Sequence, residues 1–112
     1  MNQDYPMSHL TFLRDDIQRE RYSSWDQSGG NHDYKVVKAG GNHSLADYSG
    51  PGCIQHIWMT MASDSKYYAR DVVLRVYWDS EENPSVEVPI GDFFGIGHGI
   101  VKNFWSLPLC MS

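Results

Sequence analysis

The stretch that decides the fold is VVLRVYWDSEENPSVEVPI, residues 72–90. Its first part, residues 72–78, and its last part, residues 86–90, each carry apolar side chains at every second position. Successive side chains of a strand point to opposite faces, so each part predicts a β-strand. The segment DSEENP between them, residues 79–84, is rich in turn-forming residues. The stretch therefore predicts a β-hairpin.

Other strand patterns precede the hairpin and are separated by turns. They occupy residues 34–37, residues 44–47 and residues 53–61, and the last is entered through the turn sequence SGPG. One short helix is predicted over residues 8–20, where apolar side chains recur at offsets of three and four. Many short strands with one minor helix predict an all-β chain, an antiparallel β-sandwich or barrel, with one short N-terminal helix.

Length and composition limit the class of protein. The chain has 112 residues, which predicts a single domain over residues 1–112. Its 4 Trp, 7 Tyr and 4 Phe supply large side chains for a core and argue against intrinsic disorder. The formal charge of -5 argues against a nucleic-acid partner, because such proteins cluster Lys and Arg to replace the counterions of phosphate.

The sequence also bears on the compartment. No apolar run approaches the ~18–20 residues that span a bilayer, and the start MNQDYP has neither a basic nor an apolar leader segment. We therefore expect a cytoplasmic protein with no membrane partner. The last stretch, NFWSLPLCMS at residues 103–112, is strand-like and apolar to its end, and this predicts that the fold continues beyond it.

Cysteine and histidine spacing indicates neither a metal nor another cofactor. Cys53 and Cys110 lie 57 positions apart without a CxxC motif, which predicts two buried thiols. The five histidines form no HxH or HExxH pattern. No GxSxG motif occurs, and Glu81 and Glu82 fall in the hairpin turn, where we expect them to be solvated. We therefore predict no catalytic residue within the chain.

The most unusual segment is GDFFGIGHG, residues 91–99, called here the glycine segment. Its glycines permit positive φ angles and close approach of the backbone to a ligand or to another chain. Asp92 and His98 are candidate polar contacts to a sugar, and Phe93 or Phe94 a candidate stacking face. A structural turn with a capping aspartate explains the same residues equally well.

A second candidate is WDQSGGNHD, residues 25–33, called here the polar loop. Trp25 offers an aromatic plane for the C–H face of a sugar, and Asp26, Asn31 and Asp33 offer groups that bind hydroxyls. The alternative is a loop whose Asp and Asn side chains bond their own backbone.

Four segments in order carry a resemblance to a known family: RYSSWDQSGGNHDY, ADYSGPGCIQHIWMT, LRVYWDSEENPSVEVPIGDFFGIGHG and FWSLPLCMS. Together they resemble the N-terminal part of the domain-of-unknown-function family 2961, now designated glycoside hydrolase family 172. The resemblance runs from about Arg19 to Ser112. Their combination is specific, whereas each segment alone is weak.

The resemblance implies tandem jelly rolls assembled as trimers or hexamers, so that the antiparallel β-sandwich of this chain would be a partial jelly roll. It also implies cleavage of furanosides, either α-D-fructofuranosides including difructose dianhydride or D-arabinofuranosides, with retention at the anomeric carbon. Retention requires two carboxyl groups ~5–5.5 Å apart. In the family these are glutamates downstream of the matching part, so the resemblance implies an N-terminal segment that is inactive alone. It also places seven residues in the substrate pocket wall: Trp25, Asp26, Asn31, Asp33, Asp92, Phe93 and His98.

This chain departs from the family pattern in the polar loop. Trp25 stands where a tyrosine is common, Gln27 where an arginine is common, and His32 where an acid is common. Two other readings remain open. One is a non-catalytic carbohydrate-binding module in which Trp25, Trp58 or Phe93 stacks on a glycan, and the other is a jelly-roll assembly subunit that pairs its strand edges with a second chain.

Overall fold

The structure, a computed structural model, describes residues 15–112. The chain divides into two units, residues 1–55 and residues 56–112. All regular elements of the described part belong to the second unit: α1 (Tyr68–Asp71), β1 (Val73–Val76), β2 (Val86–Pro89), α2 (Ile90–Phe93), η2 (Gly97–Gly99), β3 (Phe104–Trp105) and β4 (Cys110–Met111).

The predicted hairpin of residues 72–90 is confirmed. β1 and β2 pair antiparallel, with Arg75 opposite Glu87 and Val76 opposite Val86. A charged pair, with 2.5 Å between Arg75 Nε and Glu87 Oε2, lies on one exposed side of this sheet. Backbone hydrogen bonds continue the pairing just beyond both ends, from Ser85 N to Val76 O and from Ile90 N to Val72 O, each 2.8 Å.

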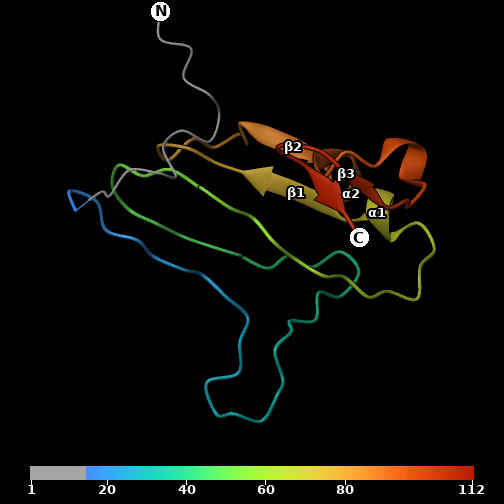
Figure 1. Ribbon diagram of the computed structural model, residues 1–112, viewed down its shortest axis with the longest axis horizontal. Helices are drawn as coiled ribbons and strands as arrows, with labels where there is room; N and C mark the ends of the chain where they lie inside the picture. The colour runs from blue at the N-terminus through green and yellow to red at the C-terminus, as the bar shows by residue number, and fades with distance from the viewer. Residues whose placement is uncertain (1–14) are drawn as a thin grey trace, which may run out of the picture. The chain divides into compact units, whose positions relative to one another are not determined.

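Two one-turn helices flank the hairpin. α1 ends just before β1 and α2 begins directly after β2, so both lie at the same end of the two-stranded sheet, as Figure 1 shows. They pack closely because Gly91 has no side chain: a Cβ there would lie 2.9 Å from both Cβ and O of Ala69. The buried apolar side chains gather around this contact: Ala69, Leu74, Ile90 and Ile96.

A second, smaller hairpin follows. β3 and β4 pair antiparallel, with Phe104 opposite Met111 and Trp105 opposite Cys110. Its turn contains the cis peptide Leu107–Pro108 and is closed by a 3.0 Å hydrogen bond from Ser106 N to Leu109 O. The strand-like pattern of residues 103–112 thus forms a hairpin.

The first unit, as far as residues 15–55 describe it, contains turns and extended chain but no helix or strand. Side chains make its longer connections. The Tyr22 hydroxyl donates a 2.9 Å hydrogen bond to the backbone oxygen of Asp47, which joins positions far apart in the sequence. Figure 1 traces this part from blue through teal to green as plain coil.

Three strand predictions are wrong for the described chain: residues 34–37, 44–47 and 53–61 carry no strand. Alternating side chains are not sufficient for a strand, because its backbone N–H and C=O groups need a neighbouring strand to bond. None of these segments pairs with another described segment. The helix predicted over residues 8–20 lies largely outside the described residues, and residues 15–20 carry no helix.

The prediction of buried thiols is also wrong, since Cys53 and Cys110 are both exposed. Neither reaches the small core around α1 and α2. The antiparallel sandwich, the partial jelly roll and the single domain over residues 1–112 stay predictions. Among residues 15–112, no helix has the length and apolarity that crossing a membrane requires.

Candidate functional site

An open hollow of about 570 Å³ lies in the second unit, beside the glycine segment. It is called here the hollow, and six residues line it: Arg70, Asp92, Gly95, Ile96, Gly97 and His98. Two of the residues predicted from the sequence, Asp92 and His98, therefore border the same space. The volume falls within the range of small-molecule sites, roughly 300–1,000 Å³.

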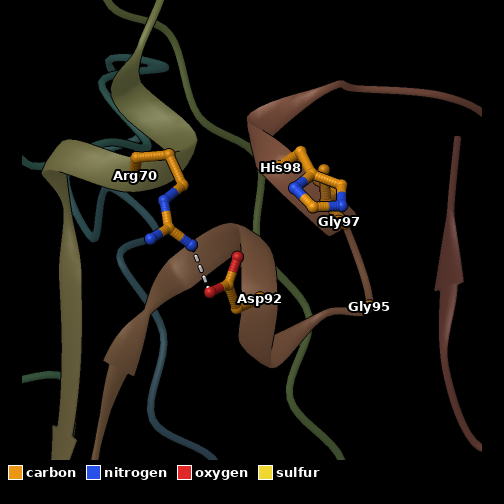
Figure 2. Close-up of a pocket in the computed structure, with 6 residues that line it drawn as sticks. Arg70, Asp92, Gly95, Gly97 and His98 are labelled. Atoms are coloured by element: carbon orange, nitrogen blue, oxygen red, sulfur yellow. Dashed lines mark hydrogen bonds and ion pairs between the residues drawn. The ribbon is translucent and has the colours of Figure 1, made fainter.

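Arg70 and Asp92 form an ion pair at the hollow, between guanidinium Nη1 and carboxylate Oδ2. Figure 2 shows the Arg70 side chain extending from α1 toward the carboxylate of Asp92 on α2. The hairpin explains the meeting, because pairing of β1 with β2 brings the two adjoining helices together. Their side chains are 49% and 33% exposed, so solvent and ligands reach both groups.

The glycine segment shapes the rest of the hollow through its backbone. Gly99 has φ +68°, and a Cβ there would approach the Arg70 Cγ to 3.0 Å. Glycine at this position thus permits both the backbone angle and the passage of the arginine side chain. His98 also lies in the left-handed region, with φ 58°, and its imidazole is exposed at the edge of the hollow.

Phe93 does not line the hollow. It packs against its neighbour Phe94 edge to face, with ring centroids 5.2 Å apart, and both rings are half-buried. Its part in stacking on a sugar stays a prediction.

In the first unit, Asp26 organises the polar loop. Its Oδ1 accepts hydrogen bonds from the backbone N and the hydroxyl of Ser28, at 2.9 and 2.6 Å, and its Oδ2 accepts one from the His32 N at 3.1 Å. Asp33 Oδ1 in turn accepts a 2.7 Å bond from the Asp26 N. These two aspartates therefore fit the alternative of a loop whose side chains bond their own backbone, because both accept hydrogen bonds from backbone N–H groups of the loop.

These bonds alter the acidity of Asp26. The hydroxyl of Ser28, followed by the backbone N–H groups of Ser28 and His32, lowers the pKa of Asp26 below its ordinary value of 3.8. The group stays charged through most of the acid range and is a hydrogen-bond acceptor rather than a general acid.

The other two predicted residues of the polar loop are Trp25 and Asn31, and neither organises the loop as Asp26 does. Trp25 is 58% exposed, which leaves its indole ring accessible as a platform. Asn31 adopts φ 59°, a backbone angle that asparagine tolerates better than most residues. Within the polar loop the structure thus brings Asp26 and Asp33 together, and it places the Trp25 indole at the surface.

Sequence reasoning missed Arg70. It lies in YYARD, which matches no motif, and it meets Asp92 across 22 positions. The available signal was the hairpin itself, since pairing of its strands places the residues before the first strand near those after the second.

Three acidic groups of the hairpin region bond separate partners. Asp92 pairs with Arg70, Glu87 with Arg75, and Glu81 accepts a 2.5 Å bond from the Ser85 hydroxyl in the turn. In the part of the chain that the structure describes, no group of three or more His, Cys, Asp or Glu side chains is arranged to hold a metal ion.

Comparison with known proteins gives one family. The model of a GH172 domain-like family matches residues 30–111, which include the glycine segment and both hairpins. Neither the curated proteins nor the solved structures include a match to this chain. Because the family model covers most of the sequence, the chain belongs to the GH172 domain-like family.

Proposed function

We propose that this chain is the N-terminal part of a furanosidase-type glycoside hydrolase that acts on α-D-fructofuranosides or D-arabinofuranosides, and that it forms a wall of the substrate pocket. Family membership supports the glycoside hydrolase context. The observation that carries the proposal is the hollow, where Asp92 and His98 of the family-matched glycine segment border one open space.

The chain contributes binding rather than bond cleavage. A retaining glycosidase needs two carboxyl groups ~5–5.5 Å apart, one acting as nucleophile and the other as acid. In the second unit Glu81, Glu87 and Asp92 are instead bonded to partners on different elements. This arrangement supports a chain that lacks hydrolytic activity alone.

An activity assay tests the proposal. The purified chain is incubated with 4-nitrophenyl D-arabinofuranosides and with difructose dianhydride, alongside an active furanosidase as positive control. We expect no sugar release. Six carboxylates are replaced one at a time by the matching amide: Asp26, Asp33, Glu81, Glu82, Glu87 and Asp92. Release that disappears in any of these single variants would overturn the proposal, whereas release that persists when all six are replaced identifies a contaminating enzyme.

The proposal extends to architecture and partners. We propose that the chain forms part of a jelly roll in the cytoplasm, assembles as a trimer or hexamer, and takes a furanoside-containing carbohydrate as its ligand, with neither nucleic acid nor membrane as partner. Exposed apolar side chains support assembly, notably Trp105 at 79% and Leu107 at 75%. Light scattering tests it, and a stable monomer at micromolar concentration would contradict it.

The binding-module reading keeps one specific observation in its favour, the exposed indole of Trp25 beside the polar loop. A module of this kind retains glycan affinity that depends on Trp25→Ala. Calorimetry with arabinan and fructan oligosaccharides tests this reading, because affinity that is lost in Trp25→Ala supports it and affinity that is unchanged in Trp25→Ala contradicts it.

A further inference from the structure

The ion pair in the hollow presents a donor and an acceptor side by side. Arg70 uses Nη1 to bond Asp92 Oδ2, and a guanidinium carries five N–H donors in a planar fork. The carboxylate likewise has lone pairs beyond the one that this bond occupies. Both side chains are partly exposed and line the hollow.

Two glycines allow this pair to form. Gly91 lets α2 approach Ala69 of α1, and Gly99 leaves room for the Arg70 side chain. Ile96, 4% exposed, forms a buried apolar part of the lining. The hollow therefore combines two charged groups with one buried apolar residue.

The charge of the hollow selects the class of ligand. Arg70 and Asp92 neutralise each other, so an anion near the guanidinium also meets the carboxylate. A neutral diol avoids this conflict, since each hydroxyl both donates and accepts a hydrogen bond. One hydroxyl donates to the carboxylate while its neighbour accepts from the guanidinium.

We propose that Arg70 and Asp92 together bind two adjacent hydroxyls of a furanose ring, and that Arg70 determines this specificity. The inference rests on the proposed function, because it names the chemistry by which the same hollow holds its sugar. Arg70 is a binding residue that the sequence motifs do not mark.

Nuclear magnetic resonance of the full 112-residue chain tests the pair. The probe is methyl D-arabinofuranoside, and its 2,3-di-O-methyl ether is the control ligand that lacks the free diol. We expect the diol to shift the backbone amides of Gly95, Gly97 and Gly99 and the ether to leave them in place. Arg70→Gln and Asp92→Asn should each weaken binding at least about tenfold, the loss expected when a hydrogen bond to a charged group is removed.

The chain contains a matched control in Arg75 and Glu87, an ion pair of the same kind on the hairpin outside the hollow. Arg75→Gln and Glu87→Gln should leave sugar affinity unchanged. The variant Arg70→Lys keeps the charge and loses the planar fork, so it should fold normally and still bind weakly. It keeps the test decisive if Arg70→Gln fails to fold.

Four results would overturn the inference. They are equal binding of the diol and its ether, unchanged affinity in Arg70→Lys, tighter binding of inorganic phosphate than of the sugar, and absence of any shift at saturating sugar. Each is distinguishable from failure of the proposed function, which would show as sugar release in the hydrolysis assay.

Discussion

The polar loop and the glycine segment have similar compositions, yet they use their aspartates in opposite ways. Both contain glycines, a histidine, aromatic residues within or beside them, and an aspartate at the second position. Asp26 bonds the backbone of its own loop, whereas Asp92 bonds Arg70, 22 positions away. The difference teaches that similar segments can position an aspartate in two ways, through local turns in one and through a tertiary contact between two helices in the other.

The largest effect should come from removing the tertiary contact that positions Asp92. Gly91→Ala places a Cβ 2.9 Å from the Cβ and O of Ala69, so α1 and α2 must separate. We expect the free energy of unfolding of the second unit to fall by ~1–3 kcal/mol. Urea denaturation followed by tryptophan fluorescence measures it.

Gly97→Ala is the matched control, because a Cβ at that position meets nothing within 4 Å. Its effect should stay within about 0.5 kcal/mol. Equal losses for the two variants would show that the close approach of the helices does not stabilise this region.

The next test concerns the local bonds of the polar loop. Asp26→Ala removes the acceptor for the backbone N–H groups of Ser28 and His32. We expect faster amide hydrogen exchange at these two residues, with no change in the glycine segment. Slower or unchanged exchange would mean that the loop is held by other groups.

Acidification should have the same effect as that substitution. The folded pKa of Asp26 is below its ordinary value of 3.8, so its contribution is fully present above pH 3.8. It is lost as the pH falls below 3.8 and through the folded pKa. The protection of the His32 amide, measured as its exchange rate relative to the intrinsic rate at the same pH, should therefore fall in that window in the native chain, and Asp26→Ala should abolish this change in protection.

A smaller effect is expected where each segment adopts a left-handed backbone. His98 and Asn31 have φ angles of 58° and 59°. Replacement of His98 by Gly should raise stability by up to about 1 kcal/mol, and Asn31→Gly by less, because asparagine tolerates this region better. Thermal denaturation of both variants measures the difference, and a reversed order would contradict the strain argument.

The sequence predicted a strand correctly where its pairing strand lies close to it in the chain. The hairpin of β1 and β2 was predictable because alternation, turn and second strand follow each other within residues 72–90. Residues 53–61 alternate as clearly, but their pattern does not say which segment would pair with them. Alternation of apolar and polar side chains indicates that a segment has an apolar and a polar face, but it does not indicate which distant strand would pair with that segment.

The candidate site was likewise predictable only in part. Asp92 and His98 were marked by the unusual density of glycines, and they do border the hollow. Arg70 was missed because nothing local distinguishes it from other surface arginines. Its place at the hollow can be inferred only by following the chain outward from the paired strands, back from β1 to Arg70 and forward from β2 to Asp92.

The spacing of Arg70 and Asp92 from the paired strands determines where the chain tolerates changes in length. Arg70 lies five residues before Arg75, and Asp92 lies five residues after Glu87, the residue opposite Arg75. Insertions in the turn of residues 77–85 leave both distances unchanged, so the hollow should survive them. Deletion of a single residue from either strand makes these two five-residue spacings unequal. One of the two charged groups then points away from the other. Length variation is therefore permitted at the tip of the hairpin and forbidden along its strands.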